Sequence, residues 1–458
     1  MAEPSVTMES TLLTLLTEKK YSSLRDILNT MNPFDIAAIF DGLEEDRLPL
    51  LFRLLPKELA ADTFVEMSPD AQELLIRGFS DSELKEVINE LYVDDAVDIV
   101  EEMPANVVRR ILTQADPDMR KQINEILRYP EDSAGSIMTT EYVSLRPGMT
   151  VEEAIKRLRR TGIDKETIYT CYVTKDRRLV GLVTVKDLLL AEDDDEPISA
   201  LMEENVISVS TMEDKEQVAQ MFSKYNFLAL PVVDNEGRMV GIVTFDDAMD
   251  VLEAETTEDM EKMAAMMPSE KPYLKSSVVS IWKNRIPWLM LLMVSATFTG
   301  MILNHFENAL AAQIALTSFI PMLMDTAGNS GTQTSVTVIR GIALGEIKFS
   351  DLMRVIWKEV RVAVLCGLSL AVAAYLKILL IDKLLLGEQG VSIGVMFTVC
   401  ITMAMTVLFA KMVGGFLPLV TKKLGFDPAV IASPLLTTIV DALSLLVYFQ
   451  VATALLHL

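Results

Sequence analysis

The sequence predicts a multidomain protein with an all-α superhelical N-terminal domain, an α/β tandem repeat and an all-α transmembrane domain of five helices. Regularly spaced turn signals, an internal repeat and five long apolar stretches support this prediction. The 458 residues are too many for one ordinary domain. Residues 1–270 hold 56 Asp and Glu against 27 Lys and Arg, a net charge of −29, whereas residues 271–458 hold 9 against 14, a net charge of +5. An acidic soluble part followed by an apolar, slightly basic part predicts a membrane protein.

The first predicted domain covers residues 1–130. Between residues 20 and 128, turn signals recur about every 11–13 residues and separate stretches of two to three helical turns. These signals are Leu55-Pro56, Ser68-Pro69, Ser80-Asp81, Val93-Asp94, Met103-Pro104 and Asp116-Pro117. Helices this short cannot bury an apolar face alone, so we expect them to stack into a superhelix.

Residues 131–200 and 201–252 form an internal repeat. The segment "SIMTTEYVSLRPGMTVEEAIKRLRR … GLVTVKDLL" is echoed by "ALMEENVISVSTMEDKEQVAQMFSK … GIVTFDDAM". The pattern of each copy predicts an opening segment, an amphipathic helix and a β-hairpin. A turn with the sequence Gly-x-x-Thr-x-x-Asp then leads to a second helix. The pair resembles tandem CBS (cystathionine-β-synthase) domains. This resemblance implies an adenine-nucleotide site in which Thr184 with Asp187, and Thr244 with Asp247, contact the ribose; a purely structural use of the pair is the alternative.

Residues 253–280 are predicted to connect the repeat to the membrane. The stretch "DDAMDVLEAETTEDMEKMAAMM" has strong helical propensity. On a helical wheel, Asp247, Asp250, Glu258 and Glu261 lie within about 80° of one another, and Glu255 and Asp259 lie on another face. An exposed acidic connector would explain the charges, but the position between a sensor-like repeat and the first span favours a regulatory role.

Residues 281–458 contain five stretches long enough to span a bilayer, each needing about 20 mainly apolar residues. They cover residues 286–305, 309–339, 357–381, 391–420 and 429–456. Lys and Arg gather before the first span and in the second and fourth connections. The positive-inside rule therefore predicts a multi-pass protein of the plasma membrane with a cytoplasmic N-terminal half and an outside C-terminus. The N-terminus "MAEPSVTMESTLL" shows no signal-peptide pattern.

The second span contains the polar run "PMLMDTAGNSGTQTS". Pro321, Gly328 and Gly331 predict an irregular backbone, which survives at membrane depth only where protein or a water-filled cavity covers it. Asn329 adds an amide oxygen to the run. The alternative is a seam of small residues that packs two helices together.

The last span carries Asp441 in an otherwise apolar stretch. Ser433, Thr437, Asp441, Ser444 and Tyr448 fall within about 80° of arc on a helix, which favours a pore lining around one carboxylate. A hydrogen bond from Asp441 to a neighbouring helix is the alternative. Lys411, in the fourth span, is a candidate salt-bridge partner, but its position near the cytoplasmic end favours snorkelling to the interface.

Composition excludes several classes of function. Strong acidity disfavours nucleic-acid binding, because phosphates would be repelled. Three cysteines show no metal-ligand spacing, and two histidines leave little room for a zinc site. No nucleophile–base set and no phosphate-binding loop is apparent, so we do not expect an enzyme.

In domain order and in the motifs "PMLMDTAGNSGTQ" and "GFDPAVIASPLLTTIVDALSLLVY", the chain resembles the MgtE family of magnesium channels over essentially its whole length. The resemblance implies a homodimer in the lipid bilayer with a pore between the subunits. It implies that Asp441, with Asn329 nearby, holds hydrated Mg²⁺. It also implies that the connecting "plug" helices close the pore when cytosolic Mg²⁺ is high.

The same resemblance implies regulatory Mg²⁺ ligands by position. They are Asp94 and Asp98 in the N-terminal domain, Glu216, Asp246, Asp247 and Asp250 in the CBS pair, and Glu255, Glu258 and Asp259 in the plug helix. Three positions depart from the family pattern: Asn226 replaces a CBS aspartate, Ser433-Pro434 replaces Asn-Pro, and Thr170 replaces an aromatic residue. The last change weakens the expectation of ATP binding at the CBS domains, although Phe227 remains.

Three functions stay open. The first is Mg²⁺ import down the electrochemical gradient, closed by cytosolic Mg²⁺. The second is a cation-coupled exporter of divalent metal ions in which Asp441 titrates. The third is a membrane-anchored nucleotide sensor or enzyme that uses the CBS pair, although spans that served only as an anchor would not need a polar stripe.

Overall fold

The computed structural model describes residues 4–269, 273–274, 276–385, 391–432 and 434–457. It divides into two compact units, the first ending at Leu252 and the second beginning at Glu253. The boundary falls within helix α15 (Phe245–Met263). Each unit is described separately below.

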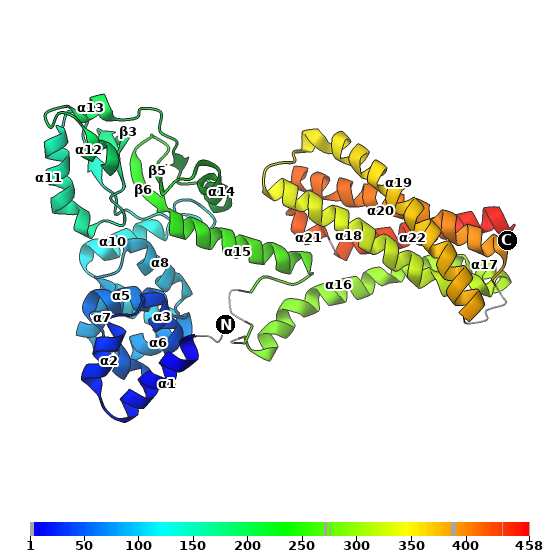
Figure 1. The fold of residues 1–458 in the computed structure, drawn as a ribbon, viewed down its shortest axis with the longest axis horizontal. Coiled ribbons are helices and arrows are strands. Elements are labelled where there is room, and N and C mark those ends of the chain that lie inside the picture. The colour runs from blue at the N-terminus through cyan, green and yellow to red at the C-terminus, as the bar shows by residue number, and fades with distance from the viewer. Residues whose placement is uncertain (1–3, 270–272, 275, 386–390, 433, 458) are drawn as a thin grey trace. The chain divides into compact units, whose positions relative to one another are not determined.

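The first ten helices stack into the predicted all-α domain (Figure 1). They are α1 Pro4–Thr17, α2 Tyr21–Leu28, α3 Pro33–Phe40, α4 Leu48–Phe52, α5 Lys57–Val65, α6 Pro69–Gly78, α7 Asp81–Ile88, α8 Val93–Glu102, α9 Ala105–Gln114 and α10 Pro117–Ile126. Helices α5 to α10 begin at intervals of twelve residues, directly after the turn signals, which confirms the predicted period. Phe52, Phe64 and Phe79 pack together in the shared core, with ring centroids 5.4–6.3 Å apart.

The repeat forms two small sheets of the same topology. The first copy consists of β1 Ser144–Leu145, α11 Val151–Thr161, β2 Thr170–Lys175, β3 Arg178–Thr184, α12 Val185–Leu190 and α13 Ile198–Leu201. The second consists of β4 Val209–Ser210, α14 Lys215–Tyr225, β5 Ala229–Val233, β6 Met239–Thr244 and the start of α15. In each sheet the first strand pairs in parallel with the second, which forms an antiparallel hairpin with the third.

The second unit is helical. Its elements after α15 are α16 Val278–His305, α17 Glu307–Ala312, a 3₁₀ segment Ile314–Phe319, α18 Ile320–Ala343, a 3₁₀ turn Phe349–Asp351, α19 Leu352–Lys377, a π-helical segment Ile378–Leu385, α20 Ile393–Lys423, α21 Pro428–Ala432 and α22 Pro434–Leu456. Helix α20 packs against α18, α19 and α22, and α22 also packs against α18 and α16.

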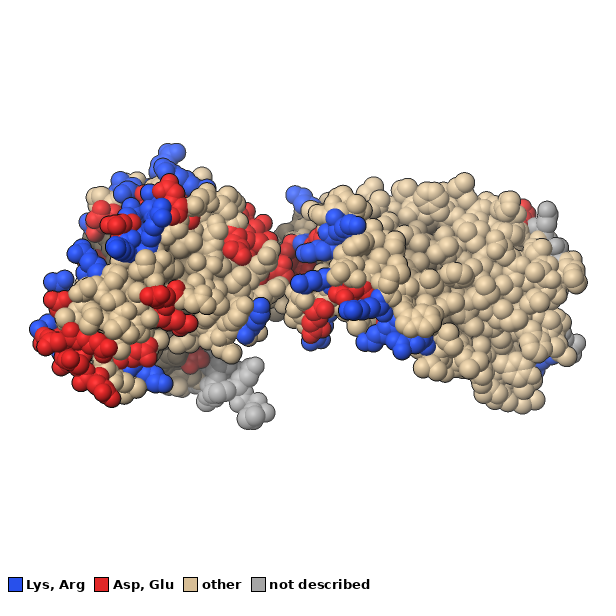
Figure 2. Space-filling model, turned by 90° about the horizontal axis from the view of Figure 1, so that it is seen from above, with Lys and Arg blue, Asp and Glu red and all other residues tan. Residues whose placement is uncertain are grey.

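Four stretches of the described chain are long and apolar enough to cross a membrane: Val278–His305, Phe349–Leu385, Ile393–Lys423 and Leu435–Leu456. Helix α18, with 24 residues, is long enough but more polar. On the face shown in Figure 2, the charged side chains of this unit gather mainly at one end, and most of the remaining surface is uncharged. If α18 crosses the membrane, its polar side chains must have a function or a polar partner there.

The predicted irregular backbone in the second span is wrong. Helix α18 runs without interruption from Ile320 to Ala343. Pro321 lies in its first turn, where a missing N–H costs no helical hydrogen bond. Gly331 instead packs closely against α20, because a Cβ atom added at Gly414 would collide with the Gly331 carbonyl. The alternative of a small-residue seam therefore holds at Gly331.

We expect Gly414→Ala to destabilise the second unit. The added methyl group would push α20 away from α18, and such overpacking typically costs about 1–3 kcal/mol. The matched control is Gly300→Ala in α16, where an added Cβ meets nothing within 4 Å. Thermal unfolding of the detergent-solubilised protein should show a lower midpoint for Gly414→Ala alone. Equal midpoints for the two variants would contradict the close approach of α18 and α20.

Candidate functional site

Asp441 lies on α22 against the small-residue part of α18. A Cβ added at Gly328 would lie 4.0 Å from Asp441 Oδ1 and 3.9 Å from Thr437 Cγ2. Asp441 is half-buried. Within the described residues, no Lys or Arg forms an ion pair with it. Because residue 328 is a glycine, the Asp441 carboxylate can lie close to the α18 backbone. No described Lys or Arg neutralises its charge there.

The exposed face of α18 next to Asp441 is polar. Its solvent-accessible side chains include Asp325, Asn329, Gln333 and Thr337, each one helical turn after the previous one. The Asn329 amide donates a hydrogen bond to Asp325 Oδ1 at 3.2 Å. Asp325 is close enough to repel Asp441 electrostatically. We call these five side chains, Asp325, Asn329, Gln333, Thr337 and Asp441, the polar membrane face.

Sequence reasoning missed Asp325, although it selected Asn329 and Asp441. The signal was available, because an acidic residue within a membrane span is expensive and usually functional. Its i, i+4 spacing from Asn329 also placed both side chains on one side of a helix. The motif drew attention to its glycines instead.

The predicted pore-lining residues have different surroundings in the single chain. Thr437 is half-buried beside Gly328, whereas Ser444 is buried among the helices. Ser433 lies outside the described residues. The Tyr448 hydroxyl donates to the Leu316 carbonyl at 2.9 Å and is fully buried, so the far end of the stripe belongs to the helix packing. The pore-lining role of Ser433, Thr437 and Ser444 stays a prediction.

Lys411 does not snorkel to solvent. It is buried on α20, and its Nζ donates to Thr334 Oγ1 at 3.3 Å. The Thr334 hydroxyl in turn donates to Glu359 Oε2 at 2.8 Å. The position of Lys411 along the span suggested an interfacial head group, but α18 and α19 supply polar partners inside the unit. Its ammonium group therefore bonds within the helix packing, and among the described residues it forms no ion pair with Asp441.

In the first unit, carboxylates from the helical domain and the CBS pair crowd together. Electrostatic repulsion links Asp94, Asp95 and Asp98 on α8 with Asp246, Asp247 and Asp250 in the first turns of α15 and with Glu141 and Glu166. Glu66 joins this group through Asp246 and Asp250. These nine residues are the acidic cluster. Among the described residues, no group of three or more His, Cys, Asp or Glu side chains is arranged to hold a metal ion. The acidic cluster therefore concentrates negative charge, but its described side chains are not arranged to coordinate a metal ion.

Burial and neighbouring negative charges raise the pKa values of several carboxyls in the acidic cluster. Burial and the charge of Asp94 raise the pKa of Asp247 to about 7. Burial and the charge of Asp247 raise the pKa of Asp95 to about 7. Surrounding protein and Asp247 raise the pKa of Asp98 to about 7 as well, although its side chain keeps contact with solvent. Burial together with Asp94 and Asp95 raises the pKa of Glu166 to about 9.

Of the predicted regulatory ligands, Asp94, Asp98, Asp246, Asp247 and Asp250 belong to this cluster. Sequence reasoning missed Glu66, Asp95, Glu141 and Glu166. Only the adjacency of Asp95 to Asp94 was visible in the sequence. The other three come from distant loops and helices that the tertiary fold brings together.

The remaining predicted ligands lie elsewhere. Glu216 on α14 accepts a hydrogen bond from the Gln220 amide at 3.1 Å. In the second unit, Lys262 Nζ contacts Glu258 Oε1 at 2.7 Å and Asp427 Oδ2 at 2.8 Å. Burial and the nearby Asp427 raise the pKa of Asp259. Glu255 is half-buried on the same helix. Lys262 thus ties the end of α15 to the loop between α20 and α21.

The residues predicted to bind a nucleotide form hydrogen bonds and ring contacts within the protein. Thr184 caps the N-terminus of α12 and forms reciprocal hydrogen bonds with Asp187. At the start of α15, Asp247 Oδ2 accepts hydrogen bonds from both the N–H and the hydroxyl of Thr244. Phe227 stacks on Tyr225 with ring centroids 5.3 Å apart. Asn226 ends α14 in the left-handed conformation, which asparagine adopts more readily than most residues.

Comparison with known proteins matches every part of this architecture. Residues 320–451 match the "MgtE: Divalent cation transporter" family, and residues 9–132 match the "MgtE intracellular N domain". Residues 134–194 and 198–254 match CBS domains.

Two relatives align over nearly their whole length. The magnesium transporter MgtE of Thermus thermophilus is 38% identical and aligns over 96% of this chain and 97% of its own. The magnesium transporter MgtE of Bacillus subtilis is 33% identical over 97% of both chains. A solved structure of the cytosolic domain of the Mg²⁺ channel MgtE in complex with ATP is 38% identical, with a TM-score of 0.51. It covers 53% of this chain and 99% of that one.

The fold and these matches define a membrane transporter for divalent cations with a helical N-terminal domain and a CBS pair, and not an enzyme. The chain belongs to the MgtE family of magnesium transporters.

The first unit should lose stability as pH rises from about 4 to about 7. A carboxyl whose pKa is raised by folding binds its proton more tightly in the folded state, so deprotonation favours unfolding. We expect Asp98→Asn to raise the unfolding midpoint at pH 8 by about 2–4 °C and to change it little at pH 4. Thermal unfolding of the full chain with divalent cations removed measures this. Asp26→Asn, at an exposed site on α2, is the control; an identical pH dependence in both variants would contradict the crowding.

Proposed function

We propose that this protein is a Mg²⁺ channel that imports the ion down its electrochemical gradient and is closed by cytosolic Mg²⁺. The observation that carries the proposal is the polar membrane face. An exposed carboxylate at membrane depth costs several kcal/mol unless it faces water, a partner or an ion. Lipid satisfies none of these conditions, so this face requires a cover that supplies them.

A second copy of the chain supplies that cover. In a symmetric homodimer the same surface of each subunit meets across a two-fold axis. Two polar membrane faces would then enclose a water-filled path lined by carboxylate, amide and hydroxyl oxygens. A cation between the two Asp441 side chains would offset their repulsion and exclude anions.

The chemistry of the lining fits Mg²⁺. This ion prefers six oxygen ligands and loses its water reluctantly. Asn329, Gln333 and the Thr437 hydroxyl can hydrogen-bond to a hydrated ion without removing its water. With the first unit in the cytoplasm and the C-terminus outside, the membrane potential contributes about 4.6 kcal/mol per divalent ion at 100 mV.

The acidic cluster supports closure by Mg²⁺. Its carboxyls repel one another when divalent cations are scarce, and an ion bound between domains stabilises the compact arrangement. Mg²⁺ therefore shifts the population according to its differential affinity, and several weak sites give a steep response. The ligands are Asp94, Asp98, Glu216, Asp246, Asp247 and Asp250, with Glu255, Glu258 and Asp259 on the plug helix. The contact of Lys262 with Asp427 supports a mechanical link from this helix to the membrane domain.

ATP is a second proposed ligand. The ATP complex of the related cytosolic domain supports a nucleotide site at the CBS pair. In this chain Thr184, Asp187, Thr244 and Phe227 are the residues that would hold it.

Asp441→Asn should reduce Mg²⁺ flux in proteoliposomes at least tenfold, because the amide keeps the shape but removes the charge that holds the ion. The control is Gln450→Ala, on the opposite side of α22. Flux equal to wild type would refute the pore assignment. Current reversal that follows a proton or Na⁺ gradient would instead support the cation-coupled exporter.

Neutralising Asp247, Asp250, Glu258 and Glu261 together, with Asn and Gln, should leave a channel that millimolar cytosolic Mg²⁺ no longer closes. The closed state would lose three proposed ligands, Asp247, Asp250 and Glu258, together with the negative charge of Glu261 on the same side of the helix. Patch recordings of inside-out membranes measure this response. A control that neutralises the run Asp193, Asp194, Asp195 and Glu196 removes the same charge elsewhere. Unchanged inhibition in the first variant would show that this stripe is an ordinary exposed face.

A further inference from the structure

The first CBS domain carries a concentrated group of cations that the proposed function does not use. Two adjoining cavities of about 490 and 700 Å³ share Arg146 and Arg157 in their walls. Together they are lined by six cations and two carboxylates, and we call this the basic pocket. The cations are Arg146, Lys156, Arg157, Arg160, Lys175 and Arg177, and the carboxylates are Glu153 and Asp176.

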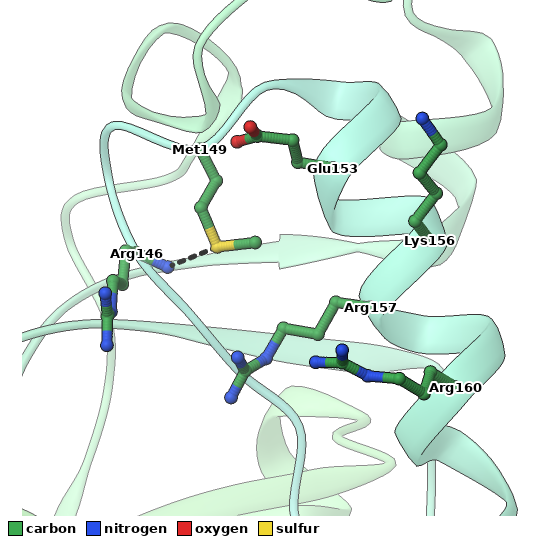
Figure 3. A pocket seen from close by; sticks show the side chains of 6 residues that line it. All are labelled: Arg146, Met149, Glu153, Lys156, Arg157 and Arg160. Carbon is green, nitrogen blue, oxygen red and sulfur yellow. Dashed lines mark hydrogen bonds between the residues drawn. The ribbon is translucent and has the colours of Figure 1, made fainter.

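The arginines converge from different elements. Figure 3 shows Arg157 and Arg160 extending from α11 toward the loop that carries Arg146, whereas Lys156 points away. Lys175 and Arg177 come from the β2–β3 hairpin, whose turn is held by a hydrogen bond from Met239 N–H to the Arg177 carbonyl at 2.9 Å. Helix, loop and hairpin therefore build one positively charged concave surface.

Most of these cations form no ion pair with the described residues of the chain. Of the six, only Lys156 forms an ion pair within the described part of the chain, with Glu152 at 2.9 Å. The other five keep their charges unpaired although residues 1–270 carry a net charge of −29. Five cations that line the pocket are therefore available to a bound anion.

The second copy of the repeat provides an internal comparison. The positions equivalent to Arg146, Arg157 and Lys175 are Ser210, Met221 and Asp234 by the alignment of helices and hairpins. Both copies have the same strands, the same helix and the same core constraints. The position equivalent to Arg160 is Lys224, also a cation, but the fold does not require Arg146, Arg157 or Lys175, and a bound anion accounts for these three.

The pocket is separate from the nucleotide turn. Along the β2–β3 hairpin, Lys175 pairs with Arg178 at one end and Thr170 pairs with Thr184 at the other. Five residues of extended strand place these ends roughly 17 Å apart. Thr184 and Asp187 therefore do not line the basic pocket.

The geometry points to the basic pocket as a binding site for a soluble anion that carries two or more phosphate groups. Arginine forms paired hydrogen bonds with phosphate oxygens, and three arginines on different elements can hold more than one phosphate group. The volume lies within the range of small-molecule sites. This inference does not depend on the proposed channel mechanism.

The test uses the full chain in nanodiscs of phosphatidylcholine, with tripolyphosphate as the probe and divalent cations removed. Isothermal titration should show saturable binding to wild type, and at least tenfold weaker binding to the variant Arg146→Ala, Arg157→Ala, Arg160→Ala. Inorganic phosphate, with one phosphate group, should bind at least tenfold more weakly than tripolyphosphate.

Two controls keep the test specific. Arg25→Ala, Arg109→Ala, Arg128→Ala removes the same charge from exposed sites of the helical domain and should bind tripolyphosphate like wild type. Asp187→Ala should also bind it like wild type, since the probe has no ribose. No saturable binding to wild type, an equal loss in the charge control, or a loss in Asp187→Ala would overturn the inference. Displacement of tripolyphosphate by an equal concentration of dioctanoyl phosphatidylglycerol would assign the pocket to a lipid headgroup and overturn the soluble ligand.

Discussion

Carboxylates repel one another strongly where neighbouring protein replaces water, and this repulsion acts in both units of the chain. In the second unit, Asp441 and Asp325 lie near each other on a membrane helix pair, and no described cation is bonded to Asp441. In the first unit, the acidic cluster raises the pKa values of its own members. A divalent cation relieves repulsion of this kind at either place, so the proposed transport and the proposed regulation rest on the same interaction.

In the second unit, helix packing determines which carboxylates have no neighbouring cation to offset their repulsion. The seam between Gly331 and Gly414 brings α18 close to α20, and Gly328 brings Asp441 close to α18. Lys411 is buried nearby but is bonded to Thr334, which also contacts Glu359. The one buried lysine of α20 is therefore committed to the interior of the unit. The polar membrane face keeps its negative charge and its exposure.

The two CBS copies show how one fold is used in different ways. In each copy, where a helix begins after the hairpin, an Asp carboxylate accepts the backbone N–H of a Thr three residues earlier, and this explains the repeated motif without any ligand. In the second copy, Asp247 also joins the acidic cluster. In the first copy, the equivalent Asp187 does not, and the opposite end of the hairpin carries the basic pocket. Features that differ between copies are more informative about binding than the features they share.

The sequence by itself determined the domain order, the twelve-residue helical period, the repeat and the polar stretches of two spans, because these depend on local spacing, turn residues and hydropathy. It also selected Asn329 and Asp441 as residues of one candidate site. Only the tertiary structure decided that α18 is an unbroken helix, that Lys411 is buried, and that Asp325 lies beside Asp441. It likewise decided that Glu66, Glu141 and Glu166 join Asp94 and Asp247. Each of these facts depends on which distant segments pack together, and the local sequence pattern of a segment does not specify its contacts in the tertiary structure.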